Sequence, residues 1–182
     1  MTWTSADHRT LPPLINELPY SVVFVCTGNI CRSPIAEVIT RTLAEAAELP
    51  DGSTLASRLN VSSAGTGPWH EGEPMDPRTA DALVRAGYPR YPHVAHQFTR
   101  AKIDQFDLTV ALDRRHQQTL RSLGSNPDRL FLLRNFDRAA GAAADVPDPY
   151  YGDEKVFDDC LSMIADGCHG IVGALVDLLS VR

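Results

Sequence analysis

The chain lacks a long apolar run, because no stretch approaches the roughly 18 consecutive apolar residues of a membrane-spanning helix. We therefore expect no membrane span. Residues 1–20 also lack a continuous apolar core, so we expect no signal peptide there. Cysteine is scarce, with four residues at scattered spacing, which is typical of a reducing compartment. The expected location is the cytoplasm, although export without a signal peptide stays open.

Positive charge is in deficit: 17 Lys and Arg stand against 23 Asp and Glu, for a net charge of −6 at pH 7. This balance argues against nucleic acid or an anionic membrane surface as the main partner. The sequence also has no internal repeat, and its length of 182 residues suits one domain with a substantial core. We expect that domain over residues 20–182, a poorly ordered N-terminal extension over residues 1–19, and a monomer.

Nine residues, C-T-G-N-I-C-R-S-P at positions 26–34, give the strongest chemical signal. They follow an apolar strand candidate and precede a helix that we expect to begin at Pro34, with Ser33 as its cap. Gly28 and Asn29 both accept left-handed backbone conformations. The loop can therefore turn its N–H groups inward and form an anion-binding nest at the positive end of a helix.

Arg32 closes this loop with a planar fork that can hold two phosphate oxygens. The same positive field would stabilise a thiolate at Cys26 and make it a nucleophile. A thiolate beneath a bound oxyanion is the chemistry of a cysteine phosphatase. Spacing alone would carry little weight, but the strand, the Gly-Asn pair and the helix start all agree with one site. The loop is not the nucleotide-binding loop G-x-x-x-x-G-K-[ST], because the lysine and the second glycine are missing.

Strand and helix candidates alternate along the chain. The strand candidates are residues 21–26, 59–63, 108–112 and 129–133, and the helix candidates are residues 34–48, 76–86, 114–123 and 154–179. This alternation predicts an α/β fold, a parallel sheet with helices on both faces and ligands beyond the carboxyl ends of its strands. Residues 51–57 and 135–149 are expected to be mobile loops.

The loop resembles the signature of the low-molecular-weight protein tyrosine phosphatases, in their bacterial form. Four later segments resemble further blocks of that family in the family's order: S-S-A-G-T-G-P-W-H at 62–70, H-V-A-H-Q at 93–97, V-A-L-D at 110–113 and V-P-D-P-Y-Y-G at 146–152. The resemblance covers about residues 20–179. It implies a four-stranded parallel sheet in the order 2-1-3-4, the phosphotyrosine protein phosphatase I-like fold, and hydrolysis of phosphotyrosine in proteins through a phosphocysteine.

Asp148 is the candidate general acid and, in a second step, the general base. It lies between two prolines, which fix its backbone, although turn aspartates are common for structural reasons. The resemblance favours the catalytic role, since the family's general acid falls on this position. We expect no cofactor and no metal, because the loop and an arginine can carry the phosphate charge.

The residues expected to bind phosphate are Thr27, Gly28, Asn29, Ile30, Cys31, Arg32 and Ser33. The resemblance implies that Ser33 donates to the Cys26 sulfur in addition to any capping, and that Asn29 joins a buried network with Ser63 and His93. A strand-end turn residue and an ordinary buried histidine are the alternatives for those last two positions. His93 and His96 are three residues apart, but no nearby carboxylate or thiol completes a metal site.

Three loop aromatics, Trp69, Tyr150 and Tyr151, are expected to line the substrate pocket, where a phosphotyrosine ring could pack between them. A surface anchor is the alternative for Trp69. Ile30 favours phosphotyrosine, since arginine phosphatases of the family tend to have threonine immediately before the second loop cysteine.

Other reactions on this fold remain as alternatives: a protein arginine phosphatase, an arsenate reductase, and a non-enzymatic phosphotyrosine-binding module. Arsenate reduction needs relay cysteines, but Cys160 and Cys168 are separated by ~12 Å of helical rise, beyond the ~7 Å reach of a disulfide. Cys31, in contrast, is close enough in sequence to pair with Cys26, and the resemblance makes a reversible redox switch a hypothesis.

Overall fold

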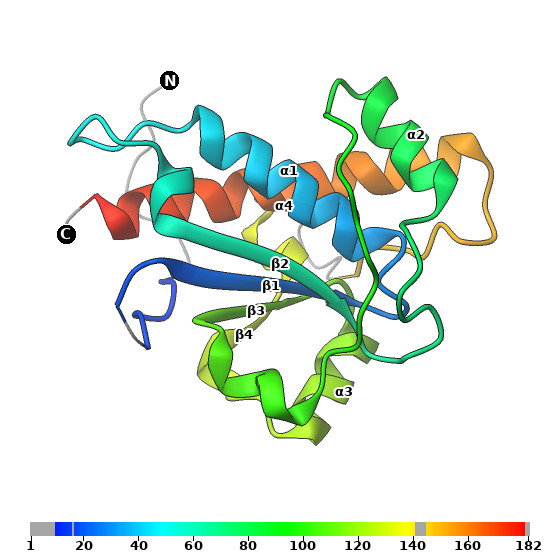
Figure 1. Cartoon of the computed structure of the whole chain (residues 1–182), viewed down its shortest axis with the longest axis horizontal. Helices are drawn as coiled ribbons and strands as arrows, with labels where there is room; N and C mark the ends of the chain where they lie inside the picture. The colour runs from blue at the N-terminus through cyan, green and yellow to red at the C-terminus, as the bar shows by residue number, and fades with distance from the viewer. Residues whose placement is uncertain (1–9, 16, 141–144, 181–182) are drawn as a thin grey trace.

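The computed structural model describes residues 10–15, 17–140 and 145–180, which are built around one parallel sheet. Its strands are β1 (Tyr20–Cys26), β2 (Leu59–Gly65), β3 (Leu108–Ala111) and β4 (Leu130–Leu132). They pair in parallel in the order β2-β1-β3-β4, as Figure 1 shows. The predicted α/β fold and strand order are therefore confirmed.

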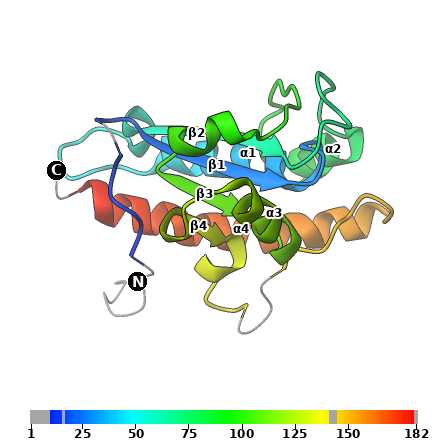
Figure 2. The same cartoon turned by 90° about the horizontal axis from the view of Figure 1, so that it is seen from below.

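Helices cover both faces of this sheet. The α-helices are α1 (Arg32–Ala46), α2 (Pro77–Arg85), α3 (Arg114–Leu123) and α4 (Glu154–Leu179), and the short 3-10 helices are η1 (Leu55–Arg58), η2 (Arg100–Gln105), η3 (Pro127–Arg129) and η4 (Leu133–Phe136). Helices α1, α2 and α4 lie on one side of the sheet and α3 on the other (Figures 1 and 2).

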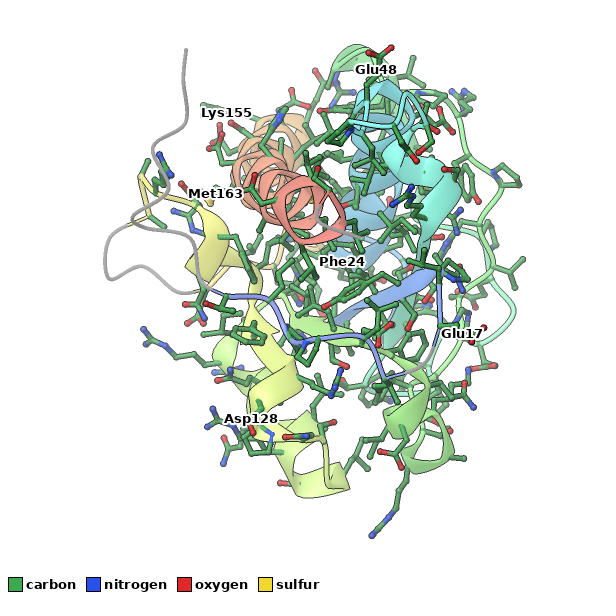
Figure 3. The ribbon with its side chains drawn as sticks, turned by 90° about the vertical axis from the view of Figure 1, so that its left-hand side faces the viewer. Glu17, Phe24, Glu48, Asp128, Lys155 and Met163 are labelled. Carbon is green, nitrogen blue, oxygen red and sulfur yellow. The ribbon has the colours of Figure 1, made fainter. Side chains whose placement is uncertain are left out.

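Side-chain alternation along β1 divides the core into two layers. Phe24 is fully buried in the larger layer, beneath α1 and α4, and Figure 3 places it in the interior below α4. Val23 and Val25 point the other way and pack with Leu120 of α3. The two layers hold β1 at the centre of the sheet, so the loop that follows it starts from a fixed point.

Helix α1 begins two residues earlier than the sequence predicts. Its N-cap is Cys31 and not Ser33, and no side chain caps it. The prediction of Ser33 as a cap is wrong because Ser33 lies in the first turn with its hydroxyl directed at the sulfur of Cys26. Pro34 fits at the third helical position, since the first four N–H groups of a helix have no intrahelical partner.

Helix α4, with 26 residues, carries a long stripe of buried apolar side chains. Among the residues that the structure describes, it is the one helix long and apolar enough to match a membrane-crossing helix by length and composition, and 44% of the matching window is buried inside the protein. Its stripe from Phe157 to Leu179 packs in the larger core layer with α1. This packing is that of a core helix.

The described part of the expected N-terminal extension, residues 10–15 and 17–19, contacts the end of the sheet opposite the loop. Leu11 is buried, the Tyr20 hydroxyl donates to the Pro12 carbonyl at 2.9 Å, and the Ile15 N–H donates to Asp107. The expectation of poor order for residues 1–9 lies outside the described residues, as does part of the loop at 135–149, residues 141–144.

Candidate active site

The loop between β1 and α1 is held in shape by the end of β2. Cys26 pairs with Gly65, and beyond that point the N–H groups of Thr66 and Gly67 donate to the carbonyls of Cys26 and Thr27 at 2.8 and 3.1 Å. Gly65 must be a glycine at this close approach, since a Cβ there would lie 2.8 Å from the Thr27 carbonyl oxygen. The strand thus fixes the first half of the loop.

Asn29 fixes the second half. It is fully buried with φ of 59°, the left-handed conformation that the sequence predicts. Its side-chain amide donates to Ser33 Oγ at 3.0 Å and to Ser63 Oγ at 2.8 Å. Its side-chain oxygen accepts from the His96 N–H at 3.0 Å. One side chain therefore ties the loop to α1, β2 and the segment before η2.

The polar network around Asn29 extends to two further groups. His93 Nε2 lies 2.7 Å from the Asn29 carbonyl oxygen, so it carries the proton and donates; burial is the main cause that lowers the pKa of His93. The Ser63 hydroxyl donates to Glu37 Oε2 at 2.7 Å. The structure thus brings Ser63 and His93 to the loop as the resemblance implied. Glu37 was missed, because nothing in an amphipathic helix distinguishes one buried glutamate.

Cys26 lies at the bottom of the loop, almost fully buried, with its sulfur 3.0 Å from the Ser33 hydroxyl oxygen. The same hydroxyl lies 3.2 Å from the Ala64 carbonyl oxygen and accepts from Asn29. A hydroxyl has one proton to donate, and a negatively charged sulfur attracts it more strongly than a neutral carbonyl does. Ser33 is therefore placed to stabilise a thiolate.

Arg32 projects from the first turn of α1 with its side chain only 4% exposed. Nη1 donates to Asp113 Oδ2 at 2.9 Å and to the Val146 carbonyl at 3.1 Å, while Nη2 donates to Asp148 Oδ2 at 2.9 Å and to Thr27 Oγ1 at 3.1 Å. Burial opposes the charge, but the charges of Cys26, Asp148 and Asp113 outweigh it and raise the pKa of Arg32. The guanidinium is a fixed cation.

Asp148 lies on the loop between the two prolines, next to Arg32. Its side chain is 49% exposed, which leaves it freer to move than Arg32. Oδ2 accepts from Arg32, and Oδ1 accepts from the Tyr150 N–H at 3.3 Å. Cys26 and Asp148 line the same pocket, so the residues predicted to act as nucleophile and acid share one cavity.

This cavity has a volume of about 300 Å³. The residues that line it are Cys26, Thr27, Gly28, Ile30, Cys31, Arg32, Trp69, His70, Asp148, Tyr150 and Tyr151. Trp69 and Tyr151 are largely exposed, 68% and 96%, and Tyr150 meets the Tyr151 ring edge-on at 5.0 Å between centroids. All three predicted aromatics therefore form its rim, and such exposed rings at a cavity mouth are suited to a flat ligand.

His70 is a pocket residue that the sequence analysis missed. Its ring lies against the loop, since a Cβ on Gly28 would come within 2.7 Å of His70 Cδ2. Nδ1 lies 2.6 Å from Glu73 Oε2, which holds the ring in place. The sequence did hold one indication of this role, because His70 directly follows Trp69, which was predicted to line the pocket. Asp113, which ends the V-A-L-D block, and His116 were also given no role, although Asp113 pairs with Arg32 and His116 bonds to Thr27.

The four cysteines are free thiols and all are buried. Cys160 and Cys168 lie on the same helix, α4, as predicted, and burial raises the pKa of each thiol to about 12. Within the described residues, no group of three or more His, Cys, Asp or Glu side chains is arranged to hold a metal ion. His93 and His96 turn to different backbone carbonyls, those of Asn29 and Val94.

Comparison with known proteins agrees with this geometry. The model of the family described as low molecular weight phosphotyrosine protein phosphatase matches residues 21–178. The chain belongs to that family. A Streptomyces coelicolor relative, a low molecular weight protein-tyrosine-phosphatase, is 44% identical over 169 residues, which is 91% of this chain and 99% of the relative.

Solved structures of the family are similar over most of the chain. The crystal structure of YfkJ from Bacillus subtilis has a TM-score of 0.74 at 36% identity and covers 85% of this phosphatase and 92% of its own chain. A structure of the YwlE arginine phosphatase has a TM-score of 0.70 at 26% identity, covering 84% and 93%. The predicted family is confirmed, and the likeness to YwlE shows that the same fold also occurs in an arginine phosphatase.

Proposed function

We propose that this phosphatase hydrolyses phosphotyrosine in proteins through a phosphocysteine intermediate. Cys26 is the nucleophile, Arg32 and the loop amides hold the phosphate, and Asp148 is the general acid and then the general base. The observation that supports these roles is the convergence of the Cys26 sulfur, the fixed Arg32 cation and the more mobile Asp148 carboxylate on one cavity.

In the first step the Cys26 thiolate attacks phosphorus and an S–P bond forms. The bond from phosphorus to the tyrosine oxygen breaks, and its electron pair stays on that oxygen, which takes the Asp148 proton. The phosphate oxygens are held by the N–H groups of the loop, by the positive end of α1 and by Arg32. These donors are fixed before the reaction starts, because Asn29 and the end of β2 hold the loop.

In the second step water attacks the phosphorus of the phosphocysteine while Asp148 takes a proton from that water. The S–P bond breaks, its electron pair returns to Cys26, and inorganic phosphate leaves. The Ser33 hydroxyl, 3.0 Å from the sulfur, stabilises the thiolate as it leaves. Both steps use the same two side chains, so the acid of the first step is restored by the second.

The cavity walls favour an aromatic phosphate ester. Trp69, Tyr150 and Tyr151 offer ring faces and edges to a phenyl group, and Ile30 adds an apolar contact at the loop. In the family that the loop resembles, phosphoarginine phosphatases tend to have threonine at the position that Ile30 occupies here. We therefore place phosphotyrosine ahead of phosphoarginine as the substrate.

The location and the partners of the protein are proposed from its thiols and its net charge. We propose a monomer that acts in the cytoplasm on tyrosine-phosphorylated proteins, because its thiols are free and its catalytic chemistry requires a reduced Cys26. The net charge of −6 supports a protein partner over nucleic acid or an anionic membrane.

The test is phosphate release from phosphotyrosine and phosphoarginine peptides in the presence of a metal chelator. Wild type should act on phosphotyrosine, Cys26→Ser should abolish turnover, and Asp148→Asn should slow it strongly. Turnover of phosphoarginine alone would overturn the substrate assignment. Turnover that survives Cys26→Ser would overturn the mechanism.

A further inference from the structure

The phosphate loop has a hydrogen-bonded support from α3, on the other face of the sheet. His116 Nε2 lies 2.8 Å from the Thr27 hydroxyl oxygen, and that same oxygen accepts from Arg32 Nη2 at 3.1 Å. His116 is buried, whereas Thr27 lies in the open mouth of the loop. A buried side chain of α3 thus reaches the residue that follows the nucleophile.

Asp113 closes this connection into a ring. Its Oδ2 accepts from Arg32 Nη1 at 2.9 Å, and its Oδ1 caps α3 by accepting from the His116 N–H at 2.8 Å. The ring runs from Arg32 to Thr27, to His116, to Asp113 and back to Arg32. Because Asp113 is the N-cap of α3, the start of that helix and the guanidinium share one anchor.

The surroundings of His116 determine which of its ring nitrogens carries the proton and in which direction its bond to Thr27 runs. Burial first, and then the charge of Arg32, lowers the pKa of His116 to about 4, so the imidazole is neutral near pH 7. Nδ1 lies 3.0 Å from Asp113 Oδ1 without forming a hydrogen bond to it, but the carboxylate would repel a bare lone pair there, which favours the tautomer with the proton on Nδ1. Nε2 is then an acceptor, and the Thr27 hydroxyl, which already accepts from Arg32, donates to it.

We propose that His116 is a positioning residue for the phosphatase reaction, fixing the Thr27 hydroxyl and through it the Nη2 side of the Arg32 guanidinium. This inference rests on the proposed function and adds a residue to it. Without His116, the Thr27 hydroxyl on its exposed loop would keep a single hydrogen bond, the one that it accepts from Arg32 Nη2. Arg32 would then keep fixed partners on Nη1 alone, since its remaining Nη2 partner is Asp148, which is half exposed.

The test measures the affinity for inorganic phosphate by calorimetry, together with kcat and KM for p-nitrophenyl phosphate. The variants are His116→Leu and Thr27→Val, which each remove one member of the bond, their combination, and His116→Gln, whose amide can still accept from Thr27. Leu120→Val is the matched control, because Leu120 is buried one turn beyond His116 on the same helix, packs in the apolar core and has no polar atom that could bond to the ring.

We expect His116→Leu and Thr27→Val each to weaken phosphate binding by about tenfold, the effect of one lost hydrogen bond to a charged network. The double variant should be no weaker than the singles, since both remove the same bond. His116→Gln should stay within about threefold of wild type. Leu120→Val should lower Tm and leave phosphate affinity unchanged.

Unchanged affinity in Thr27→Val, which changes only an exposed loop residue and keeps its shape, would overturn the proposal even if His116→Leu failed to fold. So would losses that multiply in the double variant, a His116→Gln variant as weak as His116→Leu, or an equal loss in Leu120→Val. Phosphate binding needs no turnover. If the variants change phosphate affinity as expected but the wild type does not hydrolyse phosphotyrosine, the proposed function is refuted and the positioning role of His116 stands.

Discussion

Arg32 and Asp148 are bonded to each other: Nη2 donates to Oδ2 at 2.9 Å. The arginine is buried and held by three other partners, while the aspartate is half exposed and held weakly at its other oxygen. A phosphate oxygen that takes the Nη2 donor must displace the carboxylate and not the guanidinium. The displaced Asp148 then faces the bridging oxygen, where its proton is needed.

This relationship predicts opposite effects of Asp148→Asn on binding and on turnover. Phosphate affinity should not fall, because the variant removes a carboxylate that competes for Nη2. The value of kcat/KM, which reports the first step and not hydrolysis of the phosphocysteine, should fall by about 10²–10⁴ for phenyl phosphate, the usual range for loss of a general acid. The loss should be smaller for p-nitrophenyl phosphate, whose leaving group needs less protonation. Equal losses of kcat/KM on the two esters in steady-state assays would contradict the acid role.

Asn29 supports a prediction about stability. Replacing it with Ala removes its three side-chain hydrogen bonds and places a non-glycine residue at φ of 59° without local compensation. The free energy of unfolding should fall by about 2–4 kcal/mol. Asn29→Gly should recover about 1 kcal/mol of this, because glycine accepts the conformation but makes no bonds. Urea unfolding measures both, and an Ala variant as stable as wild type would refute the structural role.

The sequence predicted the parts of the site that are local in the chain. The loop from Cys26 to Ser33, its strand, and the turn at Asp148 are each encoded within a few neighbouring residues. Their chemistry could therefore be interpreted before any fold was known. The start of α1 was misplaced because Ser33 uses its hydroxyl on a tertiary partner, the Cys26 sulfur, in place of a cap.

The supporting residues could not be predicted in this way. Glu37 and His116 lie on helices where polar side chains are common, and only the packing of α1 and α3 against the sheet brings them to the loop. Residues distant in sequence meet here because parallel strands all end at the same edge of the sheet. The family resemblance added Ser63 and His93, which spacing alone left open.

The lowered pKa of His116 predicts how stability depends on pH. The unfolded chain takes up a proton near pH 6.5, while the folded protein does so only near pH 4. Between these values the unfolded state binds more protons, so the stability due to this group is complete above pH 7 and is lost as the pH falls. From pH 7.5 to pH 5 this loss should be about 2 kcal/mol.

His116→Gln should remove that share of the pH dependence, because glutamine does not titrate. The check is urea unfolding of wild type and variant at both pH values. His93, whose pKa is also lowered, is present in both proteins, so its contribution cancels in the comparison. An equal change in the free energy of unfolding for the two proteins would contradict the assignment.

Replacing Arg78 of α2 should change the affinity for a phosphotyrosine peptide and not the affinity for inorganic phosphate. Its guanidinium carbon lies 5.5 Å from the Tyr150 ring centroid and 4.7 Å from that of Phe157, so it supports the Tyr150 wall from behind. Arg78→Ala should raise KM for a phosphotyrosine peptide by about threefold to tenfold and leave inorganic phosphate binding unchanged. Arg85→Ala is the control, since Arg85 lies on the same helix and pairs with Glu154 and Asp158. Similar KM values in both variants would contradict this role.

We predict that Cys31 makes inactivation by peroxide reversible. Burial is the main cause that raises the pKa of its thiol to about 12, so Cys26 is the sulfur that peroxide oxidises, to a sulfenic acid. The Cys31 thiol then displaces the hydroxyl as water and forms an S–S bond, which an added thiol reduces. Wild type should therefore recover after peroxide and thiol treatment, and Cys31→Ser should recover much less, because its sulfenic acid is oxidised further.

Two other cysteines provide the controls for this prediction. Cys168→Ser changes a thiol that donates to the Ala36 carbonyl on α1, away from the pocket, and it should recover like wild type. Cys160→Ser tests the other α4 thiol, which is buried and whose pKa is raised mainly by that burial. Mass spectrometry of the oxidised protein should find Cys26 joined to Cys31. Two results would show that Cys31 does not protect the nucleophile: full recovery of activity in Cys31→Ser, or failure to recover in Cys160→Ser in place of Cys31→Ser.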